Sequence, residues 1–215
     1  MQVDSASFKN MSEVEEKRIL ISVIIPALNS ANTIRKTLSS IFSGEKPQKL
    51  FEVLIVDNGS TDGTLEIVKG FPARVCSCKK RGIGFARNLG TKKAKGEILC
   101  FVDSDCVVEN DWLIRIFRFF EKYPETDGVG GPVLPYPNSR NKIQRLTGEI
   151  FVEDQGFPTT RRRVEFGEFE GVLFGANSAY RKKVLMHQSM MNGANLTERL
   201  LKNMIGKKSK GKLKK

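Results

Sequence analysis

The sequence predicts an α/β fold in one domain, with a mostly parallel central sheet flanked by helices. Three short apolar runs, at residues 19–26, 51–56 and 97–102, are typical of buried strands, and each ends in a polar turn. A helical pattern follows each turn, and this alternation of strand and helix favours a parallel sheet. Because parallel strands end at the same edge of a sheet, we expect the three turns to lie together on one rim.

Turn and capping signals place the other elements of the first half of the chain. Asn29 or Ser30 is a candidate cap for the helix after the first strand, and Gly44 ends that helix. A short helix follows the second strand, and residues 74–78 are expected to form a further strand. The turn at 82–84 opens another helix, whose first N–H groups and positive dipole end would suit a phosphate.

The second half of the chain gives a clear helix and then a weaker signal. Asn110 or Asp111 can cap a helix that stops at Pro124, and Trp112 is expected to lie outside its apolar stripe. The pattern then predicts a strand at 129–133, an irregular excursion over 135–170 and a strand at 171–179 that closes the sheet beside the rim.

The positive charge of the chain is concentrated at its C-terminal end. The net charge is +12 over 215 residues, and residues 198–215 alone carry +7. Nucleic-acid binding by the body of the protein is therefore not expected. The length suits one domain, and no apolar stretch approaches the roughly 20 residues that span a bilayer.

The cysteine spacing matches no familiar zinc pattern. One of the four lies within a predicted buried strand, so we interpret them as reduced thiols of an intracellular protein. The four are Cys76, Cys78, Cys100 and Cys106.

Paired carboxylates follow the strand at 97–102. Asp103-Ser104-Asp105 offers two hard oxygen donors at the sheet edge where α/β proteins bind ligands, and such donors suit Mn²⁺ or Mg²⁺. A polar turn that caps the next helix is the alternative. A second acidic turn, which begins at Asp57, favours a binding site, because both turns are expected on the same rim.

Four motifs in order resemble the family 2 glycosyltransferases. The resemblance covers about Ile19 to Val184, and it implies a GT-A-like fold and a nucleotide-sugar donor. The chain is expected to be shortened or divergent after that region. The motifs are Val23-Ile24-Ile25-Pro26-Ala27-Leu28-Asn29, then Val56-Asp57-Asn58-Gly59-Ser60-Thr61-Asp62-Gly63-Thr64, then Ala86-Arg87-Asn88-Leu89-Gly90, then Asp103-Ser104-Asp105.

The resemblance implies a role for each motif residue. Asp105 would hold a divalent cation, Mn²⁺ or Mg²⁺, with Asp103 at the metal or the ribose, and Asp57 would accept a hydrogen bond from the base. Arg87 would lie near the diphosphate. Asn29 and Asp62 acting only as helix caps, and Arg87 as a surface charge, are the structural alternatives. The nucleotide floor would include Pro26 and Asn29, and the acceptor side Gly175, Ala176 and Asn177.

The implied reaction is transfer of a sugar from a UDP- or GDP-linked donor to a hydroxyl acceptor, with inversion. Inversion needs a carboxylate base, which the family supplies after the acceptor segment. Here no acid occurs between Arg181 and Glu198, so Glu198 is the first candidate base after the acceptor segment. The acidic pair Glu153-Asp154 comes before that segment, in the wrong order for the family. A nucleotide-sugar-binding protein with impaired catalysis is therefore the alternative. A nucleotidyltransferase is set aside, because Ala27 to Thr33 contains no glycine.

The expected boundaries are a leader at 1–18, the glycosyltransferase domain at 19–185 and a basic amphipathic segment at 186–215. Apolar residues of that last segment recur on one helical face, and lysines follow, which suits an anionic membrane surface. An ordinary terminal helix with a solvated tail is the alternative. We expect a cytoplasmic protein, possible contact with the inner face of the membrane, and a glycan or lipid-linked acceptor. The apolar positions are Leu196, Leu200, Leu201, Met204 and Ile205.

Overall fold

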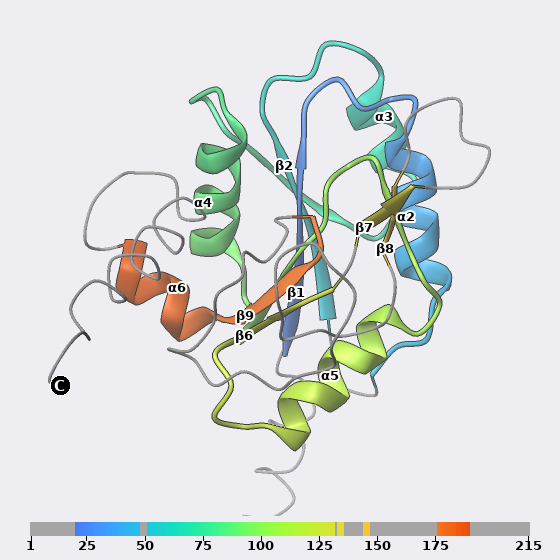
Figure 1. Cartoon of the computed structure of the whole chain (residues 1–215). Coiled ribbons are helices and arrows are strands. Elements are labelled where there is room, and N and C mark those ends of the chain that lie inside the picture. Colours follow the sequence, from blue (N-terminus) through green and yellow to red (C-terminus); the bar gives the residue numbers. More distant parts are fainter. Residues whose placement is uncertain (1–19, 48–50, 132, 136–143, 147–175, 190–215) are drawn as a thin grey trace, which may run out of the picture.

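The computed structural model describes residues 20–47, 51–131, 133–135, 144–146 and 176–189. Its centre is a six-stranded sheet of order β3-β2-β1-β4-β9-β6 (Figure 1). The first four strands run parallel to one another, and β9 runs antiparallel to both of its neighbours. The mixed α/β fold with a mostly parallel core is thus confirmed. The strands are β1 (Ile21–Ala27), β2 (Phe51–Asp57), β3 (Arg74–Ser77), β4 (Ile98–Phe101), β6 (Gly128–Gly130) and β9 (Ser178–Arg181).

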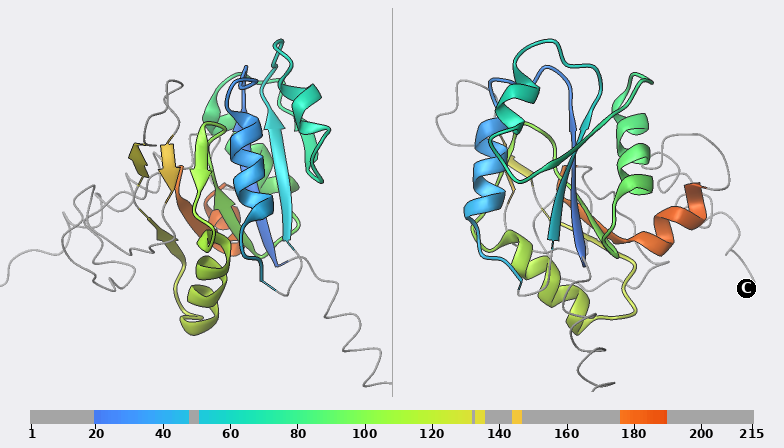
Figure 2. Two further views of the ribbon diagram at one scale, coloured as in Figure 1. Left: turned by 90° about the vertical axis from the view of Figure 1, so that its right-hand side faces the viewer. Right: turned by 180° about the vertical axis from the view of Figure 1, so that it is seen from behind.

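Helices cover both faces of the sheet, which is why its central strands are mostly apolar. Figures 1 and 2 show α4 and α6 on one side of β1 and β2, and α2 and α5 on the other. Ile24 of β1 packs in the cluster on the α4 side, whereas Val23 and Ile25 pack in the cluster on the α2 side, as the period of two requires. The helices are α2 (Ile34–Ser43), α3 (Thr64–Val68), α4 (Ile83–Lys93), α5 (Trp112–Lys122) and α6 (Lys182–Ser189).

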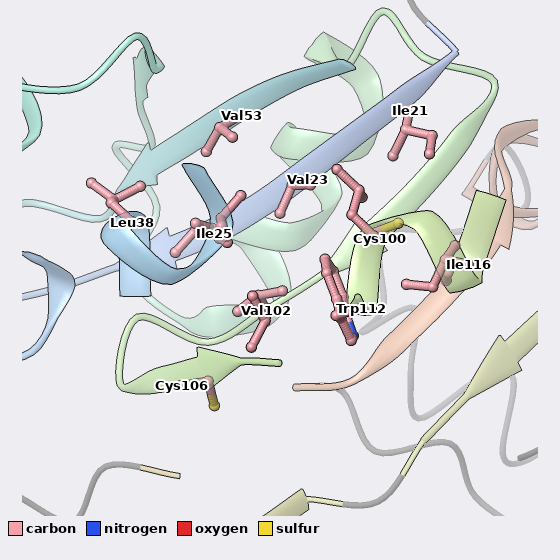
Figure 3. Close-up of a cluster of buried hydrophobic side chains, with 14 of the residues drawn as sticks. Ile21, Val23, Ile25, Leu38, Val53, Cys100, Val102, Cys106, Trp112 and Ile116 are labelled. Atoms are coloured by element: carbon pink, nitrogen blue, oxygen red, sulfur yellow. The ribbon is translucent and has the colours of Figure 1, made fainter. Parts of the chain in front are cut away.

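Trp112 is a core residue, and the expectation that it lies outside the apolar stripe of its helix is wrong. It is 2% exposed and belongs to the buried cluster drawn in Figure 3. Trp112, Ile116 and Phe120 are spaced by four residues, so they share one face of α5. The predicted stripe consisted of Leu113, Ile116, Phe117 and Phe120, so it left out Trp112, which lies one turn before Ile116.

The helix after the first strand begins later than predicted, at Ile34 and not after Asn29 or Ser30, whereas α5 begins after Asp111 as predicted; neither helix has a side-chain cap. Thr33 is the N-cap of α2 without a side-chain hydrogen bond, and the Ser30 carbonyl accepts from the N–H groups of Thr33 and Ile34. Asp111 precedes α5 but pairs its carboxylate with Arg115. The ends of both helices are where Gly44 and Pro124 predict them.

The strand expected at 129–133 is divided between two sheets. β6 joins the large sheet, whereas β7 (Val133–Pro135) joins a small sheet of order β5-β8-β7 with β5 (Cys106–Val108) and β8 (Gln144–Leu146). The closing strand begins only at Ser178, and residues 171–175 lie outside the described residues. Within the described part of the chain, no helix is long and apolar enough to cross a membrane.

Gly90 brings α4 close to the sheet. A Cβ atom at this position would lie 2.5 Å from Ile24 Cγ2 and 3.1 Å from Val56 Cγ2. Only glycine therefore allows this approach without a shift of the helix. Arg87 precedes Gly90 by about one turn of α4, so the close contact also fixes the distance between Arg87 and the edge of the sheet.

Candidate functional site

The polar turns at the carboxyl ends of β1, β2 and β4 (residues 28–33, 58–63 and 102–105) lie on one edge of the sheet, hereafter the rim. In Figure 1, β1 and β2 run upwards and end at this edge. β1 lies between β2 and β4, so two strand spacings separate Asp57 from Asp103. At the usual spacing this is about 10 Å along the rim.

Hydrogen bonds tie the first two turns of the rim together. Thr61 N–H donates to Asn29 Oδ1 (2.8 Å), and Asn29 N–H donates to Ser60 Oγ (3.1 Å). Asn29 adopts a positive φ of 49°, a conformation that asparagine tolerates better than most residues. Its side chain therefore braces the next turn of the rim and does not cap α2.

Asp62 makes a second link between the same turns. Its carboxylate accepts from Thr64 Oγ1, from Ala31 N–H (3.0 Å) and from Thr64 N–H (3.1 Å). The Thr64 hydroxyl and the Ala31 amide hold the pKa of Asp62 below its ordinary value. Because the ionised form accepts all of these bonds, Asp62 stabilises the rim as a carboxylate.

Asp57, the last residue of β2, is 5% exposed and holds its own turn. Oδ2 accepts from Gly59 N–H (3.2 Å) and Oδ1 accepts from Ser60 N–H (3.1 Å). Each carboxylate oxygen has a second lone pair. The side chain is thus fixed by the backbone while it keeps the capacity to accept from a ligand.

Asn58 connects the rim to the start of α4, which sequence reasoning did not find. Its Nδ2 donates to the carbonyls of Cys78 (3.0 Å) and Lys80 (2.9 Å), and its Oδ1 accepts from Gly82 N–H (2.7 Å). The side chain is buried, so these bonds replace water at both ends of the amide. The only sequence signal was its place beside Asp57 in the turn.

Asp103 and Asp105 belong to one tight turn. Cys106 N–H donates to the Asp103 carbonyl (3.1 Å), which reverses the chain between β4 and β5. Ser104 anchors the turn to the first turn of the rim and to α2: its Oγ lies 2.7 Å from Ser30 Oγ, and its carbonyl accepts from Thr37 Oγ1 (3.0 Å). The turn is therefore held through Ser104, between the two carboxylates.

Arg87 and Asp103 form an ion pair of 2.6 Å between α4 and the rim. Their side chains are 12% and 30% exposed, so Arg87 is not a surface charge. Arg87 Nε is buried, and among the described residues it has no hydrogen-bond partner. Within the same part of the chain Asp105 forms no salt bridge, and its Oδ1 lies 3.7 Å from Cys106 Sγ. Burial and the two carboxylates raise the pKa of the Cys106 thiol, so it remains protonated.

The segment at the start of β9 lies next to the acidic turn. β9 pairs with β4 so that its first residue, Ser178, is opposite Phe101, which precedes Asp103 by two residues. Ala176 and Asn177 are both buried. Pro26 is also buried, within β1 and opposite Val56. Gly175, Glu198 and Glu153-Asp154 lie outside the described residues.

The model of the Glycosyl transferase family 2 matches residues 22–188, which is more than half of the chain and includes the whole rim. The chain belongs to this family. It is 38% identical over 132 residues to glycosyltransferase AglE of Haloferax volcanii, with 58% of this chain and 43% of AglE covered.

Solved structures resembling this family 2 chain show the fold. Mannosyltransferase PcManGT from Pyrobaculum calidifontis, in complex with GDP-Man and Mn²⁺, matches with a TM-score of 0.61 at 20% identity, covering 87% of this chain and 52% of PcManGT. TarS 1–349 of S. aureus, in complex with UDP-GlcNAc, matches with a TM-score of 0.53 at 25% identity, covering 80% of this chain and 48% of the TarS chain. The chain spans less than half the length of the first curated relatives that it matches.

Proposed function

We propose that this chain is a glycosyltransferase that moves a sugar from a UDP- or GDP-linked donor to an acceptor hydroxyl, assisted by a divalent cation and with inversion. The observation that carries the proposal is the arrangement of the rim. Asp57 ends β2, and Asp103 and Asp105 follow β4, the two parallel strands on either side of β1. Arg87 pairs with Asp103 from α4, and the turns after β1, β2 and β4 are braced against one another.

The distances along the rim suit a nucleotide. Asp57 can accept a hydrogen bond from a base N–H, because its two oxygens are held by backbone donors and each keeps a lone pair. Asp103, about 10 Å away, would face the ribose or the diphosphate. Arg87 brings a charge that attracts phosphate to the side of the rim where it pairs with Asp103.

The residues of the acidic turn fit a cation that arrives with the diphosphate. Among the described residues no group of three or more His, Cys, Asp or Glu side chains could hold a metal by itself. Mg²⁺ and Mn²⁺ sites in nucleotide enzymes need only one or two carboxylates, because phosphate oxygens and waters complete the shell. Asp105 and Asp103 would supply these carboxylates, and the cation would stabilise charge on the departing diphosphate.

Donor turnover by an Asp105 variant tests the proposal. Release of nucleoside diphosphate from UDP- and GDP-sugars with Mn²⁺ should fall at least 100-fold in Asp105→Ala. Asp111→Asn is the matched control, because Asp111 pairs with Arg115 at the surface of α5, away from the rim. Equal turnover in the native protein, Asp105→Ala and Asp111→Asn would refute the role of Asp105.

The alternative of a binding protein with impaired catalysis rests on the missing base. No acid occurs between Arg181 and Glu198 in the sequence. Metal-dependent binding of a nucleotide sugar without release of nucleoside diphosphate, even with a panel of acceptors, would favour this alternative.

We also propose that the basic segment at 186–215, most of which lies outside the described residues, contacts anionic membrane and favours a lipid-linked acceptor. The support is the sequence: +7 over residues 198–215. Each basic residue near such a surface adds about 1 kcal/mol, and salt screens this attraction. Binding to phosphatidylserine vesicles should therefore weaken strongly at high salt, and binding that is absent or insensitive to salt would refute the contact.

A further inference from the structure

A buried hydrogen bond joins the helix after the acidic turn to the start of β9. The indole N–H of Trp112 donates to Oδ1 of Asn177 over 2.8 Å. Both residues are almost fully buried, at 2% and 3% exposed. The two are 65 residues apart in sequence, and the bond connects α5, which follows the acidic turn, with the segment that lies beside it.

This bond fixes the orientation of the Asn177 amide. An indole N–H can only donate, so the atom that faces it must be the carbonyl oxygen of the amide. Turning the amide by 180° would place N–H donors against each other in a buried site, which is costly. Trp112 therefore determines that the NH₂ end of Asn177 faces away from α5.

The backbone of Asn177 is held as well. Its carbonyl accepts from Gly131 N–H (3.0 Å), and the following residue, Ser178, is paired with both Phe101 of β4 and Gly130 of β6. Asn177 is thus fixed on three sides at a point where the register places it next to the residues that precede Asp103.

Trp112 shares a buried cluster with the residues on either side of the acidic turn. Its buried cluster includes Val102 and Cys106, which flank Asp103-Ser104-Asp105 on either side. Figure 3 draws Trp112 together with Val102, Cys100 and Cys106 of this cluster. One aromatic side chain thereby belongs to the core that includes Val102 and Cys106 and also holds Asn177 through its N–H.

We propose that Trp112 is a positioning residue for the transfer reaction. Acting through Asn177, it sets the start of β9 relative to Asp103-Ser104-Asp105, and it touches neither donor nor acceptor itself. The inference rests on the proposed glycosyltransferase function and assigns a residue to it. A role in positioning predicts a specific split: nucleotide binding stays intact while turnover falls.

Trp112→Phe tests that split, because phenylalanine keeps most of the buried ring and removes the N–H donor. With Mn²⁺, the affinity for the nucleoside diphosphate should stay within about twofold, while kcat for release of nucleoside diphosphate from its sugar falls at least tenfold. Asn177→Ala should behave in the same way, and the double variant should be no worse than the poorer single variant. Phe120→Leu, a buried change on the same face of α5, is the control for a general loss of stability and should keep kcat per folded molecule.

A spectroscopic measurement tests the contact without any activity. Trp112 is the only tryptophan in the chain. Fluorescence excited at the long-wavelength edge of tryptophan absorption, where tyrosine does not absorb, therefore reports this residue alone. Asn177→Ala should shift the emission of Trp112, whereas Phe120→Leu should leave it nearly unchanged. The melting temperatures of Trp112→Phe, Asn177→Ala and the double variant should show the same lack of additivity.

The outcomes separate this inference from the proposed function. Unchanged emission in Asn177→Ala, additive effects in the double variant, or an equal loss of kcat in Phe120→Leu would overturn the positioning role and leave the glycosyltransferase proposal standing. A wild-type chain that turns over no nucleotide sugar would overturn both, even if the emission shifts as expected.

Discussion

The guanidinium of Arg87 lies 2.6 Å from the Asp103 carboxylate in a largely buried setting, and this pair balances charge at the β4 end of the rim. Its cation offsets one of the two carboxylates of the acidic turn. Asp105, the other carboxylate, forms no ion pair within the described part of the chain. The two aspartates of one short motif therefore differ in their electrostatic surroundings, which their spacing alone does not reveal.

Replacing Arg87 should weaken nucleotide binding. Hydrogen bonds to charged groups contribute about 1.5–3 kcal/mol, so Arg87→Met should raise the Kd for a nucleoside diphosphate with Mn²⁺ about 10- to 100-fold. Arg87→Lys should recover part of the loss, because lysine keeps the charge without the planar fork. Calorimetric titration measures the effect. Arg115→Met, at an exposed ion pair, is the control, and an equal loss in that variant would contradict the role of Arg87.

At the scale of the element, α4 connects the core to the rim. Gly90 sets its approach to β1 and β2, Arg87 reaches Asp103 one turn earlier, and Asn58 holds the loop before its first turn. Helical periodicity predicts such a helix but not its distance from the sheet. That distance depends on the absence of a single Cβ atom.

Gly90→Val should destabilise the fold. The added side chain would collide with Ile24 and Val56, whose branched side chains are fully buried, and overpacking of this kind costs about 1–3 kcal/mol. This exceeds the gain of a few tenths of a kcal/mol, at most, from replacing glycine in a helix by valine. The midpoint of urea unfolding measures the change. Gly70→Val, at an exposed turn, is the control and should stay within about 0.5 kcal/mol; no difference between the variants would contradict the tight contact.

The opposite edge of the sheet is held by Glu52. It accepts from Ser22 Oγ (2.7 Å), from Lys95 N–H (2.6 Å) and from Arg74 through Nε and Nη2 (3.1 and 2.9 Å). Burial alone would raise the pKa of Glu52, but these hydrogen bonds and the charge of Arg74 outweigh it, so the pKa lies below its ordinary value.

The stability that Glu52 provides should depend on pH. A lowered pKa means that its contribution is complete above the unfolded value, near about 4.3, and is lost as the pH falls through the folded value. Glu52→Gln should cost about 1–3 kcal/mol at pH 7, and the difference from the native protein should shrink below about pH 4. Urea unfolding at a series of pH values tests this. Glu66→Gln, at an exposed pair with Lys69, should have almost no effect, and a Glu52 effect independent of pH would contradict the account.

At the scale of the whole molecule, the order β3-β2-β1-β4 explains why the rim could be predicted from the sequence. Three apolar runs with polar turns are sufficient for a parallel sheet, and a parallel sheet collects its turns at one edge. The positions of Asp57, Asp103 and Asp105 follow from that rule. Pro26 and Asn29 follow in the same way, although their proposed contacts with nucleotide remain a prediction.

The contacts that stabilise the rim could not be predicted, because they join residues far apart in sequence. Ser104 binds Ser30, Asn58 binds the carbonyl of Lys80, and Trp112 binds Asn177. Each depends on how helices and turns are placed in space, which no local pattern encodes. Trp112 is an example: its spacing from Ile116 and Phe120 is compatible with burial, although the stripe counted from Leu113 missed it, and no pattern indicates Asn177 as its partner.

Calorimetric titration with UDP, GDP and other nucleoside diphosphates, with Mn²⁺ and again with EDTA, tests the central claim most directly. The account predicts that binding is selective for the base, with uracil preferred. Binding should weaken at least tenfold without the metal, and it should be lost in Asp105→Ala. Equal binding of all nucleotides in the absence of metal, or no binding at all, would contradict it.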